Sequence, residues 1–591
     1  MPRFETPDGR IVYVPSVYSD IKVIDNLPGP LPEFQIPIIV GEADEADYPY
    51  TFNTVKQVVE DTHIPFVGVG TSSACKAKFG NDSNVSIAMA FAKRHGLPWA
   101  YVVAINALTR ASVPAHSAGP IVQGTIFAKR FGAVGGHIKL QVVAGTTVSI
   151  TPVKRYSLLT ANALTGVSRI YVKDSSWLSE GDSVTIGDNN SNDAAYVVDS
   201  VGTEISSTGQ ITHYIELTTT LAVDITTAQY GMALVYDTGK AETPDAFASL
   251  QAMLDWFNDE SNYLGFQKGA AWTNPAALIA LAAATPIKEI VAWGAAVAGT
   301  SPAMVTGDHT TFIAALDATD WDAFALSEQV IPQAFLVLSS ESAQHALWRD
   351  WSIAKRVEGY TVSITTGCAW GDIDLGAVGD TNPVVRSAAL NCQDVSLWAC
   401  GLDKVASYLS LAPAVYGRRI KGGVGHNLTN DPLIYSSIEV NWDERGSGEL
   451  TTLHKKGVGT LRLSTAGGAI GYRVSQGLST LQNNASSWNA SDATTPLLMQ
   501  RDLADFCTRV ISQDLDATQL GGDEVTEASV AAVVVKRCEK TLKRRGRITA
   551  YSINSVALDD NGAGWNASVA LTLPVTSDFI GLNVNILVGE E

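Results

Sequence analysis

A regular alternation of short apolar runs and amphipathic segments is the feature that most limits how this chain can fold. The run 35–41 is almost wholly apolar and is typical of a buried strand, in which Pro37 is tolerable only near the start. Later segments repeat the order of strand and helix. The expected strands are 66–70, 100–105, 138–144, 287–293, 334–338, 361–366 and 395–400, and the expected helices are 54–60, 84–95, 119–130, 243–259, 341–357 and 404–412. This order predicts an α/β layer unit around a largely parallel sheet.

Proline and cap residues set the expected helix ends. Thr243 before Pro244 and Asn274 before Pro275 each provide a cap followed by proline at the first helical position. Pro413 is expected to stop the last helix of the unit.

Residues 145–235 follow a different pattern. Short alternating segments at 168–172, 183–186, 195–201, 211–217 and 232–236 are separated by polar turns. This spacing predicts a small all-β barrel or sandwich, inserted into a loop of the α/β unit and projecting from its surface. Its acidic residues lack the spacing of an EF-hand, so a solvated edge is expected rather than a calcium site. They are Asp182, Asp188, Asp193 and Asp199.

Composition bounds the class of protein. The chain of 591 residues is long enough for three or four domains, and only 17% of its residues are charged. With thirteen Trp, this predicts extensive subunit contact, although a large monomer with big cores has a similar composition. The net charge of −19 argues against a general nucleic-acid binder. The most apolar window, 276–299, is interrupted by Pro286, Lys288 and Glu289, so no membrane span is expected, and no signal peptide is recognisable.

Motifs for catalysis are incomplete. Gly68–Ser73 resembles GxGxxG, but Ser73 takes the place of the third glycine. No GxSxG, P-loop or metal-spaced histidine cluster occurs, so no enzyme, metal or cofactor is predicted. The six cysteines form no CxxC and are expected to be reduced core thiols. Cys507 and Cys538 lie on the apolar faces of their helices, which leaves a disulfide between them open.

The C-terminal stretch 525–591 predicts a helix, a hairpin and a last strand. Helix 525–545, closed by Gly546, has an apolar sector at Ala531, Val534, Val535, Cys538 and Leu542. Its opposite, basic face contains Lys536, Lys540, Lys543 and Arg544, with Arg547 just past the cap. The hairpin strands are 547–558 and 565–574, and the strand 579–588 presents Ile580, Leu582, Val584, Ile586 and Val588 on one side. Such a strand either completes its own sheet or pairs with that of a neighbour.

The first 34 residues predict an extended arm that is the counterpart of this strand. Extended pieces at 10–18 and 21–24 precede a proline-rich run, 27–32, that cannot be helical. The residues expected to pair with another subunit are Val12, Tyr13, Val14, Val17, Tyr18, Ile21 and Val23.

The third region resembles a contractile tail sheath protein of a myophage-type bacteriophage. Expected strands at 450–454, 460–463 and 469–472 surround glycine-rich turns in the run LHKKGVGTLRLSTAGGAIGYR, residues 453–473, and a helix follows at 496–511. The run 546–552 and the closing strand continue the likeness, which is best over 430–591. Gly471-Tyr472-Arg473 departs from the family's Gly-Ala-Arg-Thr, and Pro15-Ser-Val-Tyr18 departs from its Pro-Gly-Val-Tyr arm.

The resemblance implies a structural protein that assembles with itself. Subunits of this family stack as hexameric rings around a tail tube, joined by exchanged terminal strands, and contract to drive the tube through the host envelope. The implied partners are the tail tube, baseplate and tail terminator proteins, without direct nucleic-acid binding or membrane insertion. The implied location is the virion tail, after assembly in the host cytoplasm. The basic helix face is expected to meet an acidic tube. The family's likeness to subtilisin implies no protease here, because no matching Asp, His and Ser set is recognisable.

The expected fold class is therefore α/β and α+β multidomain, with a C-terminal sheath domain completed by exchanged strands. The expected parts are an arm at 1–34, α/β halves at 35–144 and 237–425, the β insertion at 145–236, the C-terminal core at 426–575 and a strand arm at 576–591. A capsid-decorating or surface-layer protein, or a hydrolase with a scattered site, are the alternatives.

Overall fold

The computed structural model describes most of the chain between residues 36 and 574. The described residues are 4–5, 11–12, 36–46, 67–69, 72–116, 122–143, 147–187, 193–205, 211–227, 231–273, 287–293, 296–318, 332–358, 360–369, 372–402, 405–434, 438, 448–464, 471–482, 497–519, 525–558 and 565–574. They form a mixed α/β chain with several separate sheets. Among them, no helix combines the length and apolar character needed to cross a bilayer.

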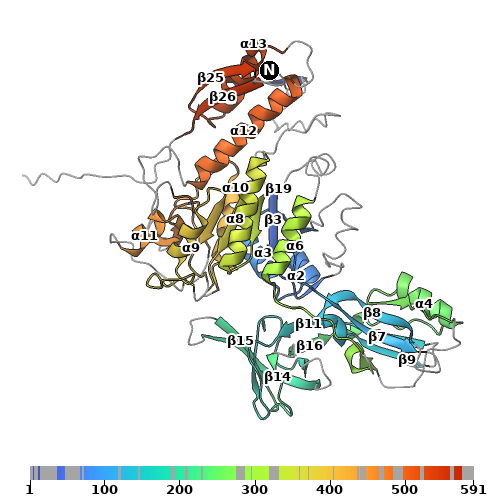
Figure 1. Ribbon diagram of the computed structural model, residues 1–591. Coiled ribbons are helices and arrows are strands. Elements are labelled where there is room, and N and C mark those ends of the chain that lie inside the picture. Colours follow the sequence, from blue (N-terminus) through green and yellow to red (C-terminus); the bar gives the residue numbers. More distant parts are fainter. Residues whose placement is uncertain are drawn as a thin grey trace, which may run out of the picture.

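A seven-stranded sheet forms the centre of the molecule (Figure 1). Its order is β22 (Val458–Gly459), β21 (Val395–Trp398), β20 (Ser363–Gly367), β19 (Pro332–Val337), β3 (Ile36–Gly41), β6 (Ala100–Ala104) and β5 (Val67–Val69). All neighbouring pairs are parallel except β5 and β6. The prediction of a largely parallel sheet is confirmed.

Helices cover both faces of this sheet, which is why its strands are apolar on both sides. On one face, α6 (Thr306–Asp317), α8 (Ser342–Val357) and α9 (Pro383–Leu390) share a core with Ile38 and Val40. On the other, α2 (Ser72–Phe79), α3 (Asn84–Arg94) and α10 (Leu411–Gly422) share a core with Ile39.

Pro37 is accommodated near the start of β3, as expected. The pairing of β19 with β3 is irregular at this point. The hydroxyl of Tyr416, in α10, accepts a hydrogen bond from the Ile38 amide at 2.8 Å and donates one to the Ala334 carbonyl at 2.8 Å. Tyr416 thus satisfies backbone groups where the ladder is disturbed.

Several expected helices and strands of the α/β unit are wrong. The expected helix 119–130 is a strand, β8 (Val122–Gly132), whose residues 124–129 alternate between buried and half-buried. The expected strand 287–293 is only a two-residue strand, β18 (Lys288–Glu289), followed by a 3₁₀ turn. Pro413 does not end a helix, because it lies in the first turn of α10, where no amide donor is needed.

Two further elements differ from the expectation. Helix α4 (Leu250–Asp259) begins later than Thr243, because the Ser249 side chain accepts the Ala252 amide at 3.2 Å. The expected strand 450–454 is a helix, α11 (Glu449–Lys455). The expected helix 54–60 and the one beginning at Asn274 lie outside the described residues.

A separate β unit is formed by strands that precede and follow the insertion in the sequence. These strands do not join the parallel sheet. One sheet has the order β17 (Leu264–Lys268), β8, β4 (Glu45–Ala46), with β7 (Arg110–His116) also pairing with β8. A second sheet has the order β10 (Thr147–Thr151), β9 (Lys139–Val143), β18. These strands and α4 enclose their own apolar core. Figure 1 shows this unit beside the central sheet.

The expected insertion is a six-stranded antiparallel sheet. Its order is β11 (Val153–Leu158), β16 (Met232–Tyr236), β13 (Ser183–Gly187), β14 (Ala194–Ile205), β15 (Ile211–Leu217) and β12 (Arg169–Val172). All its strands fall within the expected span 145–236, and it also has its own core. It lies below the central sheet in Figure 1.

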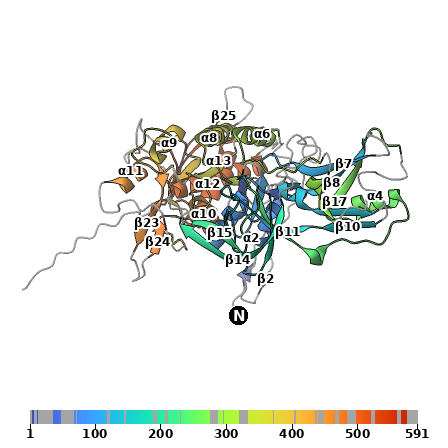
Figure 2. The same cartoon turned by 90° about the horizontal axis from the view of Figure 1, so that it is seen from below.

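The C-terminal part extends from the other end of the central sheet. Strands β23 (Leu461–Ser464) and β24 (Gly471–Val474) form the expected hairpin. Helix α12 (Leu498–Gln519) then leads to α13 (Glu527–Arg537), a π-helical turn at Cys538–Lys543, β25 (Ala550–Leu558) and β26 (Trp565–Thr572). Figure 2 shows α12 and α13 stacked behind α8 and α10.

Candidate inter-subunit surfaces

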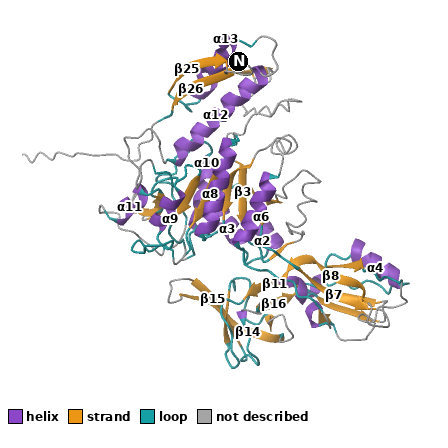
Figure 3. Cartoon of the chain, in the orientation of Figure 1, coloured by secondary structure: helices purple, strands orange, loops and turns teal. Residues whose placement is uncertain are grey.

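The hairpin β25–β26 is a sheet of only two strands (Figure 3). The strands pair antiparallel from Ala550 opposite Thr572 to Leu558 opposite Trp565, with one irregularity between Ile553 and Ser555. Among the described residues, neither strand has a second neighbour, so each presents one unpaired edge. Unpaired edges carry free amide and carbonyl groups that can accept a further strand.

One face of this hairpin is buried and the other is exposed. Tyr551, Ile553, Val569 and Leu571 pack against a core formed with α12 and α13. Ser552, Ser568 and Ala570 point the other way and are exposed. The core itself contains Val424, Met499, Leu503, Phe506, Cys507, Val510, Ile511, Val534, Cys538, Leu542 and Ile548. The hairpin is therefore held by its face while its edges stay open.

Helix α13 packs on α12 through a narrow stripe. Val530, Val534, Cys538 and Leu542, each four residues apart, are at most 3% exposed. Val535 was expected in the same sector, but its side chain is 40% exposed. This expectation is wrong because spacing by four residues leaves the neighbouring position beside the stripe.

The basic residues of this helix divide into two groups. Lys536, Lys540, Lys543 and Arg544 are exposed, and Lys543 forms a 3.2 Å ion pair with Glu539. Arg547 is different, because its Nη1 donates to the Val424 carbonyl at 2.6 Å and joins the C-terminal layer to the end of α10. The exposed four form the surface that we call the basic face from here on. That they face a tube stays a prediction.

The two cysteines of this core are free thiols and fully buried. Burial raises the pKa of Cys507 to about 12 and also raises the pKa of Cys538. Thiol–disulfide exchange proceeds through the thiolate, which is disfavoured in such surroundings. A disulfide between them stays a prediction.

The expected arms are largely outside the described residues. Val12 lies in β2 (Ile11–Val12), which pairs with β1 (Phe4–Glu5) of the same chain. The other arm positions are not described: Tyr13, Val14, Val17, Tyr18, Ile21, Val23, Ile580, Leu582, Val584, Ile586 and Val588.

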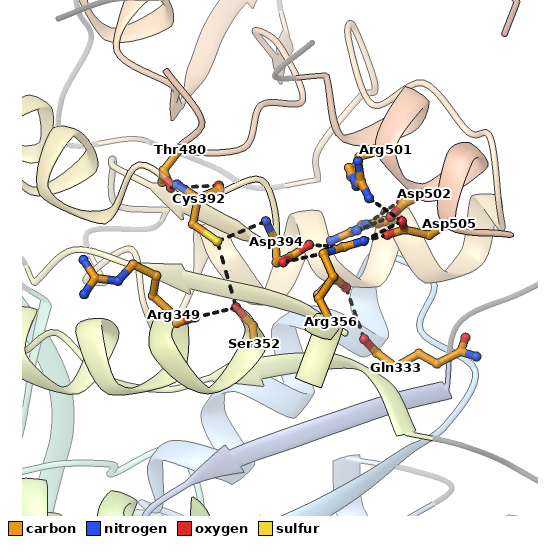
Figure 4. A network of polar contacts seen from close by, with 12 residues as sticks. Gln333, Arg349, Ser352, Arg356, Cys392, Asp394, Thr480, Arg501, Asp502 and Asp505 are labelled. Carbon is orange, nitrogen blue, oxygen red and sulfur yellow. Dashed lines mark hydrogen bonds and ion pairs between the residues drawn. The ribbon is translucent and has the colours of Figure 1, made fainter. Parts of the chain in front are cut away.

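A polar network that the sequence reasoning missed fastens α12 to the central sheet (Figure 4). Arg356, at the end of α8, donates from Nε to Asp394 Oδ2 at 3.0 Å and from Nη1 to Asp505 Oδ1 at 2.9 Å. Arg501 also donates to Asp505, at 2.7 Å. Burial lowers the pKa of Arg356, but the bonds to Asp394 and Asp505 outweigh this and raise it. The spacing of Arg501 and Asp505 by four residues is visible in the sequence, whereas their partner Arg356 is not.

A second pair lies deeper in the same junction. Arg419 of α10 donates from Nε to Asp502 Oδ2 at 2.9 Å, and a second bond joins Nη2 to Oδ1. Both side chains are at most 7% exposed. This bidentate pair and the network of Arg356 tie the base of α12 to α8 and α10, so the helix extends from a fixed base to the C-terminal layer.

A cleft of about 900 Å³ between the central unit and the two β units was also missed. Its lining contains six cationic residues and three acidic ones. They are Lys76, Lys129, Arg130, Lys154, Arg155 and Lys240, with Glu45, Asp174 and Asp237. These residues come from segments far apart in the chain, so no sequence window shows their convergence.

Neither a protein-family model nor a curated protein matches the sequence. The solved structures to which the chain is similar include a sheath tail protein from Desulfitobacterium hafniense, with 11% identity, TM-score 0.47 and coverage of 95% of this chain and 100% of that one. A sheath tail protein from Listeria innocua has 12% sequence identity and a TM-score of 0.47, and the match covers 91% of this chain and 92% of that one. The contracted helical sheath of the anti-feeding prophage has 14% sequence identity and a TM-score of 0.35, and the match covers 49% of this chain and 77% of that one.

Proposed function

We propose that this chain is the structural, non-catalytic subunit of a contractile tail sheath. The observation that carries the proposal is the two-stranded sheet β25–β26, which is buried on one face and unpaired at both edges among the described residues. Two-stranded sheets are marginal in water, and an added strand pairs the free backbone groups of an edge. The sequence resemblance over 430–591 supplies the family in which such an edge is completed by neighbours.

The terminal segments are the proposed donors of the added strands. A strand of ten residues, such as 579–588, spans roughly 33 Å, which is enough to reach another subunit. A head-to-tail contact of this kind does not close on itself and generates a continuing polymer. In the proposal, hexameric rings stack around a tail tube between a baseplate and a terminator. Contraction is a rigid-body rotation of subunits, with the exchanged strands retained as hinges.

Deletion of residues 579–591 tests this proposal. The full chain is expected to form hollow ridged cylinders in negative-stain electron microscopy, whereas the truncated chain stays monomeric. Val584→Pro is expected to block assembly, because proline lacks the amide donor, and Val584→Ala is the matched control that assembles. Polymers formed by the truncated protein would contradict the exchange of this strand. Flat lattices of the full chain would indicate a surface layer, and monodisperse particles of the full chain would contradict a polymer.

The basic face is the proposed contact with an acidic tube. Exposed ion pairs contribute only about 0–1 kcal/mol each, so the contact can be released when the sheath widens. The double variant Lys540→Glu/Lys543→Glu is expected to reduce assembly on tubes while sheath polymerisation without tubes is unchanged. Lys240→Glu/Lys268→Glu makes the same charge change in the β unit and serves as the control. Tube assembly equal to that of the control would refute the contact.

A further inference from the structure

Three side chains with metal-ligating atoms converge where the inserted sheet meets the surrounding β unit. His137 ends the 3₁₀ turn Ala133–His137, Glu289 lies in β18, and Asp193 directly precedes β14. Nδ1 of His137 lies 2.6 Å from Oε2 of Glu289 and 3.3 Å from Oδ2 of Asp193. One ligand atom from each residue lies within 4.8 Å of the other two.

The cluster is almost closed to solvent. The side chain of His137 is fully buried, and those of Glu289 and Asp193 are 9% and 16% exposed. Oδ1 of Asp193 and Nε2 of His137 are buried and have no hydrogen-bond partner within the described part of the chain. Two buried carboxylates need positive charge beside them, because burial of unpaired charge is strongly unfavourable.

Gly187, at the end of β13, makes room for this arrangement. A Cβ at this position would overlap the carboxylate of Asp193. The inserted sheet therefore places Asp193 against its own backbone on one side and against His137 on the other. The sequence had indicated a solvated edge for Asp193, but the fold holds its carboxylate in place.

Protonation of the imidazole is one way to supply the positive charge. Burial lowers the pKa of His137, but the hydrogen bonds that its Nδ1–H donates to Asp193 and Glu289 outweigh this and raise it to about 9. Burial raises the pKa of Glu289 to about 7. A shared proton therefore holds the three groups together at neutral pH, although it leaves Oδ1 of Asp193 without a partner.

We propose that His137, Asp193 and Glu289 bind a divalent cation, with Zn²⁺ as the preferred ion. Imidazole nitrogen and carboxylate oxygen are established zinc ligands, and bond lengths of 2.0–2.2 Å in a tetrahedron place ligand atoms roughly 3.3–3.5 Å apart. The spacing of His137 and Asp193 already has this value, and that of His137 and Glu289 has to open by less than about 1 Å. The cation replaces the proton on Nδ1, which leaves to solvent, and water completes the fourth position.

A bound cation would add a polar link between two units that already share an apolar cluster, in which Ala133 and Val134 pack with Tyr156, Met232 and Leu234. Asp193 belongs to the inserted sheet, whereas His137 and Glu289 flank β9 in the surrounding β unit. Ligation would fix the orientation of the insertion. This inference does not depend on the proposed polymer, because β9 and β14 lie at the opposite end of the molecule from β25–β26 (Figure 1).

Zinc titration of the full chain, treated first with a chelator, tests the proposal. Calorimetry is expected to give one equivalent of Zn²⁺ per chain, and Asp193→Asn and Glu289→Gln are each expected to weaken binding at least about tenfold, since each removes an anionic ligand. His426→Ala is the matched control, because His426 also lies beside a carboxylate, Asp431, at 2.7 Å. X-ray absorption is expected to show nitrogen and oxygen ligands without sulfur.

Two results would overturn the site. Absence of saturable zinc binding by the wild-type chain would leave the cluster as a proton-linked ion pair only. Binding of equal strength in Asp193→Asn and Glu289→Gln would place the zinc elsewhere. Both variants keep the size of the original side chain, and their thermal unfolding without metal shows whether they are folded.

Discussion

The seven-stranded sheet and the two-stranded hairpin β25–β26 differ in how much of their surface other elements cover. The central sheet is covered by helices on both faces, and its core includes fully buried Trp348 and Trp398. The hairpin has one covered face and two edges that are unpaired among the described residues. The central sheet pairs its strands and buries its apolar side chains within one subunit. The hairpin has backbone amide and carbonyl groups at its edges that can pair with a further strand. This difference is the reason why assembly through the hairpin is proposed above.

Helix α12 connects these two regions. Its base is fixed by ion pairs to α8 and α10, and its apolar residues from Met499 to Ile511 belong to the core of the C-terminal layer. Substitutions and changes in pH should therefore affect the central sheet and the C-terminal layer differently.

Arg419→Met should have the largest effect, because it removes the buried guanidinium that binds Asp502 through two hydrogen bonds. We expect a loss of about 3–5 kcal/mol in the free energy of unfolding, measured by chemical denaturation. Hydrogen exchange should show α12 losing protection along with α10. The double variant Arg419→Met/Asp502→Leu removes both charges and should recover most of the loss; equal stability of the single variant and wild type would refute this role of the pair.

Acidification should have the next largest effect and should lower the stability of the central unit more than that of the C-terminal layer. Burial lowers the pKa of His309 to about 4 and of His345 to about 3, and both belong to the central unit. The unfolded chain binds these protons near pH 6.5, so stability falls as pH decreases from 6.5 towards those values, by about 2 kcal/mol for each histidine at pH 5. Residues 497–574 contain no histidine, so hydrogen exchange in the C-terminal layer should respond less between pH 6.5 and 5.

His309→Asn sharpens this pH test. Nδ1 of His309 accepts the indole N–H of Trp348 at 2.9 Å, and the amide oxygen of asparagine can accept the same bond without titrating. We expect the decrease in stability between pH 6.5 and 5 to shrink by about 2 kcal/mol in this variant. An unchanged pH dependence, followed by Trp fluorescence during denaturation, would show that His309 does not contribute.

Thr526→Ala should have a smaller effect, confined to the C-terminal layer. The Thr526 side chain accepts the Ser529 amide at 3.2 Å and caps α13. Its loss should destabilise the layer by about 1 kcal/mol, measured as hydrogen exchange in α13. Thr508→Ala, at an exposed position within α12, is the control and should change stability by less than about 0.5 kcal/mol. Equal effects of the two variants would argue against the cap.

Val535→Ala should have the smallest effect on the isolated subunit. Its side chain is 40% exposed, so the change in unfolding free energy should stay within about 0.5 kcal/mol. The adjacent Val534 is fully buried, and Val534→Ala should cost roughly 1–2 kcal/mol for two lost methyl groups. A larger loss for Val535→Ala than for Val534→Ala in thermal unfolding would mean that the packing of α13 on α12 is misassigned.

The residue pattern of a single segment was sufficient to predict several of the strands and helices. The strand at 334–338 is a buried apolar run, and it appears as β19, at Pro332–Val337. The helix at 341–357 has its apolar residues at helical spacing, and it appears as α8. Gly546, expected to close the C-terminal helix, has the positive φ of 68° that favours glycine.

Prediction failed where a neighbour decides the structure. Residues 119–130 have an ambiguous pattern, and only pairing with β7 and β17 makes Val122–Gly132 a strand. Pro413 was expected to end a helix, although proline fits the first turn of a helix equally well. Arg547 was grouped with the exposed cations, but a carbonyl at the end of α10 binds it.

Which segments are apolar and extended, which are amphipathic, and that a basic helix precedes a hairpin can all be predicted from the residues alone. The folded chain was needed to show that His137, Asp193 and Glu289 meet, that Arg356 and Arg419 bind α12, and that β25–β26 has no third strand among the described residues. The physical reason is the range of the interactions. Side-chain periodicity acts within a few residues, whereas ion pairs and strand pairing join groups such as His137 and Glu289, which lie 152 residues apart.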